Sequence, residues 1–154
     1  MKRRMDFKWS LDYLNKVLEA KRKVEIQNKK LDDLRAEMCS IKGAGYEERI
    51  TGIGNNAVED KMIEYIALRD EYMVSWIDSR AYQLKIQEEA IERIMLLRPG
   101  RCREFLLRRY VYGISEPEIA IEFGYVEDSS IYHLRKRALE KFERMATARG
   151  WKNK

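Results

Sequence analysis

The sequence predicts an all-α protein in which two long amphipathic helices precede a group of shorter helices. Three observations indicate this. The 154 residues contain only two prolines and eight glycines, so helix breakers are few. These breakers gather in residues 43–54 and again after residue 98. Elsewhere, apolar residues recur at three- and four-residue steps, which is the period of an amphipathic helix.

The first long helix is expected from Ser10, a residue type suited to the N-cap, to Ile41. The second is expected from Ala57 to Leu97, a stretch without glycine or proline. With the rise of an α-helix they would be roughly 45–50 Å and roughly 60 Å long. The apolar positions of the first are Leu11, Leu14, Leu18, Leu31, Leu34, Met38 and Ile41. Those of the second, at roughly heptad spacing, are Ile63, Ile66, Met73, Ile77, Leu84, Ile91, Ile94 and Met95.

The segment GAGYEERITGIGNN, residues 43–56, is expected to be a flexible loop between the two long helices. Two interpretations of the pair remain open: an antiparallel hairpin within one chain, or coiled-coil strands that pair with a second copy. The sequence therefore predicts a long-helix region over residues 1–97 and a separate C-terminal domain over residues 98–154.

The C-terminal domain begins with a short amphipathic helix, RCREFLLRRYVYG, which is expected to bury Phe105, Leu106 and Val111. Gly113 stands where a helix commonly ends. The next helix is expected from Glu116 to about Glu122, after the capping box Ser115-Glu116-Pro117-Glu118. Its inward side chains are expected to be Ile119 and Phe123.

Ala120 and Gly124 predict a helix-turn-helix. The second helix of such a motif crosses the first where a small residue allows close approach, and the turn needs a residue that accepts positive φ. The last helix would then start near Asp128 or Ser129, either of which can cap it. Its inward positions are Ile131, Leu134, Ala138, Phe142 and Met145, with Leu139 beside them.

The run RRYVYGISEPEIAIEFGY…SSIYHLRKRALEKF resembles the helix-turn-helix of sigma factor region 4. More narrowly, it resembles that module in small phage-encoded late transcription regulators of the ArpU and RinA type. The resemblance covers roughly the last third of the chain. Ile131 lies seven residues after Gly124, where the family's pattern has six.

The resemblance implies that the last helix enters the major groove of double-stranded DNA. It assigns base reading to Ser129, Tyr132 and His133, with Ser130 adjacent, and phosphate contacts to Lys136 and Arg137. Hydroxyl and imidazole groups can hydrogen-bond to base edges, and Lys and Arg neutralise phosphates, so the chemistry agrees with these roles. Arg108 and Arg109, in the preceding helix, are expected to hold the DNA backbone nearby.

Charge is distributed unevenly along the chain. Residues 1–42 carry a net +5, residues 43–97 a net −5 and residues 98–154 a net +5. A basic C-terminal third favours a polyanionic partner there. Contact with RNA polymerase is implied by the resemblance alone, and self-association as a homodimer through the long helices is a further expectation.

Several classes of function are not expected. With one histidine and two cysteines, Cys39 and Cys102, the sequence offers no metal-site pattern, no cofactor motif and no catalytic constellation, so we predict no enzyme. It also has no apolar run of about 18 residues or more, the length that a transmembrane helix needs. The expected location is the cytoplasm of a bacterial host, at the nucleoid.

The leading hypothesis is a phage or prophage transcription regulator, a late-gene activator or sigma-like factor that reads promoter DNA through the helix starting near Ser129. One alternative is a DNA-packaging small terminase subunit, which also joins a helix-turn-helix to long helices but assembles into rings. The other is a coiled-coil adaptor in which the helix-turn-helix contacts a protein, with the acidic middle segment attracting a basic partner.

Overall fold

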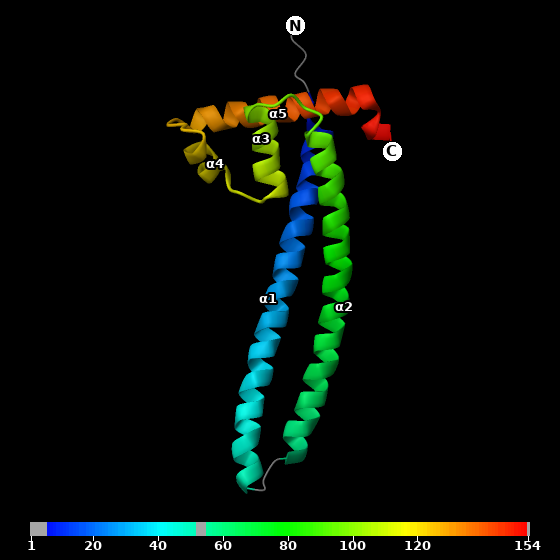
Figure 1. Cartoon of the computed structure of the whole chain (residues 1–154), viewed down its shortest axis with the longest axis vertical. Coiled ribbons are helices and arrows are strands. Elements are labelled where there is room, and N and C mark those ends of the chain that lie inside the picture. Colours follow the sequence, from blue (N-terminus) through cyan, green and yellow to red (C-terminus); the bar gives the residue numbers. More distant parts are fainter. Residues whose placement is uncertain (1–5, 52–54, 154) are drawn as a thin grey trace. The chain divides into compact units, whose positions relative to one another are not determined.

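The computed structural model describes the backbone of residues 6–51 and 55–153, and the side chains of residues 6–41 and 57–153. Over these residues the protein is all-α and contains no strand, as the sequence predicts. Two long helices pack side by side and shorter helices follow (Figure 1). The elements are α1 (Lys8–Thr51), α2 (Asn55–Ile94), α3 (Arg101–Leu106), the π-helical turn η1 (Leu107–Val111), α4 (Glu116–Glu122), α5 (Asp128–Arg149) and the 3₁₀ turn η2 (Trp151–Asn153).

The long helices have other ends than the sequence indicated. The backbone of α1 stays helical past residue 43 to Thr51, and α2 begins at Asn55. A glycine in a helix costs only about 1 kcal/mol relative to alanine, so Gly43 and Gly45 need not end one. The loop predicted over residues 43–56 is therefore wrong for residues 43–51 and 55–56, whose backbone is helical, and residues 52–54 lie outside the described residues.

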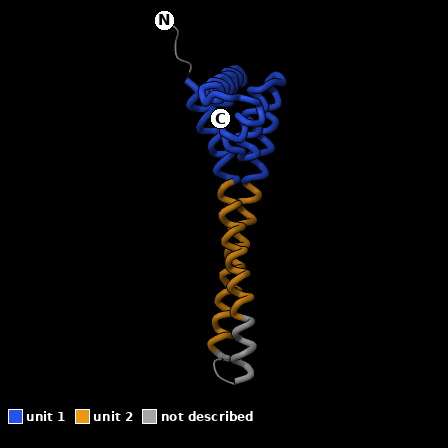
Figure 2. The backbone as a smooth tube through the Cα atoms, turned by 90° about the vertical axis from the view of Figure 1, so that its left-hand side faces the viewer, with its two compact units in different colours: residues 1–21, 83–154 blue, residues 22–82 orange. Residues whose placement is uncertain are grey.

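By its internal packing the chain divides into two compact units, and the domain boundary expected near residue 98 stays a prediction. Unit 1 comprises residues 1–21 and 83–154, and unit 2 comprises residues 22–82 (Figure 2). The start of α1 and the end of α2 thus belong to the same unit as the C-terminal helices.

Unit 1 has one apolar core to which all of its main helices contribute. Phe105 and Phe142 are its largest fully buried side chains. The inward positions expected for the C-terminal helices are mostly confirmed, although Phe123 and Met145 are only half-buried. The buried members are Leu14, Val17, Leu18, Ala90, Ile94, Phe105, Leu106, Leu107, Tyr110, Val111, Ile119, Ile131, Leu134, Ala138, Leu139 and Phe142.

A buried carboxylate holds the first turn of α1. Glu143 of α5 accepts hydrogen bonds from the Ser10 backbone N–H (2.9 Å) and the Ser10 hydroxyl (2.5 Å). It also pairs with the Lys152 Nζ at 2.5 Å. The prediction that Ser10 is the N-cap is wrong, because α1 begins earlier and the Asp6 carboxylate accepts from the Lys8 N–H at 2.9 Å.

In unit 2 the two long helices run antiparallel, and α1 pairs through its expected apolar face, whereas α2 pairs through a different face than its aliphatic pattern indicates. Helix α1 buries the expected apolar positions of this stretch, Leu31, Leu34 and Met38. Helix α2 instead turns inward a heptad-spaced set of polar and aromatic residues, among them Tyr72, Trp76 and Ser79. The Gln27 amide donates to the Ser75 hydroxyl across the pair at 3.0 Å.

The isoleucines of the apolar stripe expected on α2 are consequently exposed in unit 2, whereas Met73 of that stripe is half-buried. Ile63 is 66% exposed, Ile66 is 39% exposed and Ile77 is 52% exposed. Two stripes of heptad spacing on α2 could each pack against another helix. Within one chain, the stripe that contains the aromatic residues packs against α1. The single chain therefore has the hairpin arrangement, and pairing with a second copy stays a prediction.

Candidate nucleic-acid interface

Helix α4 begins and ends as its local sequence predicts. The Ser115 hydroxyl caps it by accepting from the Glu118 N–H at 3.4 Å. At the other end, Gly124 has φ +73°. The Gly124 N–H donates to the Ile121 carbonyl (3.1 Å), and the Tyr125 N–H donates to the Ala120 carbonyl (2.9 Å). These two hydrogen bonds together define a Schellman motif. Positive φ at Gly124 is thus confirmed.

A fixed core positions α5 behind this turn. Ile119 of α4 and Leu134 of α5 are both almost fully buried. The Arg135 guanidinium pairs with the Glu116 carboxylate at 3.4 Å and ties α5 to the first turn of α4. A shared apolar core and an ion pair therefore both join α5 to α4.

The first turns of α5 carry the predicted base-reading residues. Ser129, Tyr132 and His133 are exposed, and Ser130 is half-buried. The rings of Tyr132 and His133 are arranged edge to face, with their centres 5.7 Å apart. Neither expected cap is present, because α5 starts at Asp128 and its N-cap residue is Glu127, whose side chain makes no capping hydrogen bond to the backbone and instead accepts from the Ser129 hydroxyl at 3.4 Å.

The structure brings six of the eight predicted residues onto α5 and separates the other two. Lys136 and Arg137 are exposed on the next turn of α5. Arg108 and Arg109 lie on η1 instead.

The contacts of those two arginines lie within unit 1. Arg108 pairs with Glu104 at 3.8 Å, pairs with Glu122, and stacks its guanidinium 5.2 Å from the centre of the Phe123 ring. Arg109 donates to the Ile114 carbonyl at 3.4 Å. Both therefore brace the turns around α4, and a contact with the DNA backbone stays a prediction.

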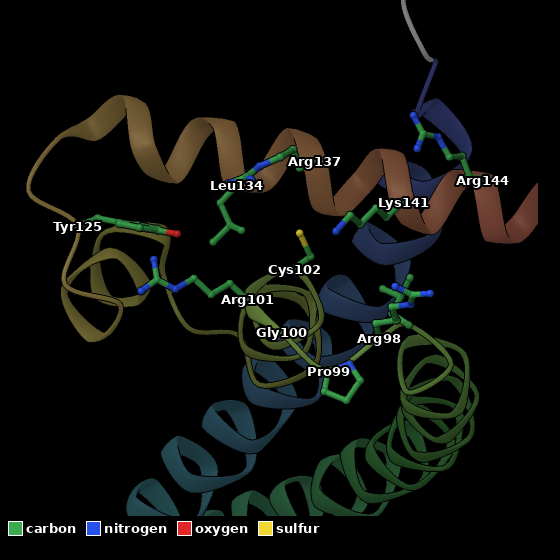
Figure 3. Close-up of a pocket in the computed structure, with 11 residues that line it drawn as sticks. Arg98, Pro99, Gly100, Arg101, Cys102, Tyr125, Leu134, Arg137, Lys141 and Arg144 are labelled. Atoms are coloured by element: carbon green, nitrogen blue, oxygen red, sulfur yellow. The ribbon is translucent and has the colours of Figure 1, made fainter.

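Sequence reasoning missed a basic cleft between α5 and the segment that enters α3. The cleft has a volume of about 760 Å³ and lies wholly within unit 1 (Figure 3). Its cationic residues are Arg98, Arg101, Arg137, Lys141 and Arg144. Its other lining residues are Leu97, Pro99, Gly100, Cys102, Tyr125 and Leu134, so none of the described residues that line it is acidic. Of these lining residues, Arg137 is the one that the sequence analysis had assigned to DNA binding.

The sequence held part of the information needed to find the cleft. Arg137, Lys141 and Arg144 are spaced at i, i+4 and i+7, which places them on one side of a helix. Figure 3 shows the Lys141 side chain and the Cys102 sulfur directed toward one another, whereas the Arg144 guanidinium points away from them toward the start of α1. Arg98 and Arg101 join them only through tertiary packing.

Within the cleft, Arg101 is oriented by aromatic rings. Its guanidinium carbon lies 5.0 Å from the centre of the Tyr125 ring and 5.9 Å from that of Phe123. Such stacking leaves the N–H groups of a guanidinium available at its edge. The residue is therefore held in place while keeping donors for a ligand.

A second cleft in unit 1, of about 480 Å³, has a different character. Acidic residues Asp12 and Glu89 line it together with Lys16 and Arg93. The Arg93 guanidinium carbon lies between the rings of Tyr13 (4.9 Å) and Trp151 (4.7 Å) and is paired with Glu89. Mixed charge of this kind does not favour a polyanion.

Two other kinds of feature, a metal centre and a membrane-spanning helix, have no counterpart in the described residues. No group of three or more His, Cys, Asp and Glu side chains there is arranged to hold a metal ion. None of the helices, over the residues described, is both long and apolar enough to cross a membrane.

Comparison of the chain with protein-family models, with curated proteins and with solved structures finds no significant match.

Proposed function

We propose that this protein is a DNA-binding transcription regulator that inserts the first turns of α5 into the major groove. The observation that carries the proposal is the exposed start of α5, where Tyr132 and His133 precede Lys136 and Arg137. Phenol and imidazole groups can exchange hydrogen bonds with base edges, and the two cations can neutralise phosphates. The attachment of α5 to α4 through the shared core and the Arg135–Glu116 ion pair supports this role, because base reading needs a helix that is held in place.

The narrower proposal, a phage or prophage late-gene activator or sigma-like factor, rests on the resemblance to sigma factor region 4. In it, the long helices mediate self-association or contact RNA polymerase. The exposed stripe of Ile63, Ile66 and Ile77 favours self-association, since an apolar face of this kind is stabilised by a partner. A dimer would place two α5 helices on half-sites about one helical turn of DNA apart.

The same stripe keeps a second candidate in consideration, a DNA-packaging subunit that assembles into a ring. Oligomeric mass separates the two. Sedimentation analysis of the whole chain would show a monomer or dimer for the regulator and a ring of many subunits for packaging. Binding of a basic protein without any DNA binding would favour the third candidate, a coiled-coil adaptor.

The test of the proposed function is selection from a random duplex DNA library at about 150 mM salt, near physiological ionic strength. We expect an enriched sequence, and its symmetry will report whether a dimer binds. The double variant Lys136→Ala/Arg137→Ala should weaken binding to all sequences and reduce the slope of log K against log salt concentration by about 2. Tyr132→Ala and His133→Ala should instead change which bases are preferred.

A matched control removes the same charge elsewhere. Lys23→Ala/Lys29→Ala takes two exposed lysines from unit 2 and should leave both the affinity and the salt slope unchanged. If the α5 variant and this control bind equally well, α5 is not the element that contacts DNA.

A further inference from the structure

The basic cleft continues the predicted DNA-binding face of α5 along the same helix. Ser130, His133, Arg137, Lys141 and Arg144 follow one another at three- and four-residue steps, so they lie along one side of α5. Arg137 belongs both to the predicted face and to the cleft. A nucleic acid bound to the start of α5 therefore has a continuous path toward the cleft.

Helix length gives the cleft its position relative to a groove. The 22 residues of α5 correspond to about 33 Å, whereas the major groove is about 12 Å wide. Only the first turns can lie among base edges. The turns that carry Lys141 and Arg144 then lie beyond the groove, where the sugar–phosphate backbone is.

The cleft has the chemistry that a phosphate backbone requires. Four of its five cations are arginines, whose planar guanidinium groups can bind phosphate oxygens in a bidentate manner. All five cationic side chains are exposed, so they are accessible to a phosphate backbone. Arg101 is held by the Tyr125 ring, which reduces the conformational entropy lost when it contacts a ligand.

We propose that this cleft binds the sugar–phosphate backbone of duplex DNA that flanks the bases read by α5. In this arrangement Arg98 and Arg101 contact the backbone from the α3 side, while Arg137, Lys141 and Arg144 contact it from α5. The inference rests on the proposed function, and it extends the interface from one helix to two segments of the chain. It contributes affinity and register without contributing base preference.

The first test is the double variant Arg101→Ala/Lys141→Ala. Each lost phosphate contact should lower the salt slope by about 1 and, at about 0.15 M salt, the affinity by about five-fold, so the pair should cost about 25-fold. The sequence selected from the random library should stay the same as for the unaltered protein. The Lys23→Ala/Lys29→Ala control should show neither loss. Equal slopes and affinities for the cleft variant and the control would overturn the proposal.

The second test needs no substitution, because the two cysteines report on two places. Cys102 lines the cleft, whereas Cys39 is an exposed residue of unit 2. With free duplex at about 100 times its Kd, alkylation of Cys102 should slow about 100-fold if only the free protein reacts. Cys39 should react at an unchanged rate. DNA that binds without protecting Cys102 would overturn the proposal.

A further arm separates the DNA backbone from a small phosphate ligand. Inorganic tripolyphosphate, tested in place of duplex, should protect Cys102 only weakly and lose this effect at physiological salt. If instead it protects Cys102 fully while duplex does not, the cleft is a site for a small polyphosphate and the inference is wrong. If no duplex binds the unaltered protein at all, the proposed function itself fails, which is a result distinct from loss of the cleft's role.

Discussion

Removing the Glu143 carboxylate should destabilise unit 1. The carboxylate is 5% exposed and accepts from both the N–H and the hydroxyl of Ser10, which is fully buried. Glu143→Ala leaves both donors without an acceptor in a site closed to water. Lys152, which pairs with Glu143, is 35% exposed and can return to solvent, so its loss adds little.

The magnitude follows from these contacts. A buried donor left unsatisfied costs about 1–3 kcal/mol, and hydrogen bonds to a charged group contribute more than neutral ones. The carboxylate also lies at the N-terminus of α1, where the helix dipole favours negative charge by about 0.3–1 kcal/mol. Removing the buried charge of Glu143 also removes its desolvation cost, which offsets part of this loss. We expect Glu143→Ala to lower the free energy of unfolding by about 3 kcal/mol, and Glu143→Gln by about half as much.

The assay is urea unfolding followed by tryptophan fluorescence in a Trp76→Phe background. In that background Trp9 and Trp151 remain, and both belong to the aromatic cluster around Phe142 next to Glu143. Ser10→Ala is the partner control and should cost about 1 kcal/mol. A Glu143→Ala protein within about 1 kcal/mol of the unaltered one would refute the view that this carboxylate holds the start of α1.

Two further predictions concern the turn and the pH range. Gly124→Ala should cost about 1 kcal/mol, because Gly124 has φ +73° and an added Cβ would meet no atom within 4 Å, so backbone strain is the whole cost. Gly124→Asn should cost clearly less, and equal urea midpoints for the two variants would contradict this account. Unit 1 should also lose stability as the pH rises above about 10. Burial, and then a hydrogen bond to Glu89, raise the pKa of Tyr13 well above its ordinary value, and burial also raises the pKa of Tyr110. The unfolded phenols ionise first, so the stabilisation is complete below that pH and declines above it. Tyr13→Phe should show a shallower decline of the urea midpoint between about pH 10 and 11.5, and an identical decline would refute the assignment.

Features determined by neighbouring residues could be predicted from the sequence. The ends of α4 follow from Ser115 and Gly124, whose hydrogen bonds and dihedral angles involve residues at most five positions away. The inward side of α5 follows from its apolar period, and so does the exposure of Tyr132 and His133.

Features that depend on distant residues could not be predicted. Ser10 looks like an N-cap in the sequence, but α1 begins at Lys8, and the N–H and hydroxyl of Ser10 both donate to Glu143, which is 133 residues away. Arg98 and Arg101 join Lys141 in the basic cleft only after α3 packs on α5. These contacts lie between elements, where periodicity gives no information.

The face with which α2 pairs was missed for another reason. Its aliphatic and aromatic stripes have the same heptad period, so periodicity alone does not choose between them. Isoleucine has no polar atom in its side chain, which favours Ile77 as the buried residue. Tyr72 and Trp76, however, have larger side chains and so offer more contact area to α1. In the structure the aromatic residues of α2 face α1, and Ile63, Ile66 and Ile77 are exposed.

The division of unit 1 into two stretches of sequence has a consequence for folding. Closing the chain between residues 21 and 83 as a flexible loop would cost about 4 kcal/mol in entropy. The hairpin of unit 2 avoids most of that cost, because pairing of α1 with α2 can proceed from the turn one layer at a time. Each step then joins residues that the previous step has already brought close. Contacts as distant in sequence as Tyr13 with Glu89 are thus reached through a succession of local events, which favours rapid assembly of a core with high apparent contact order.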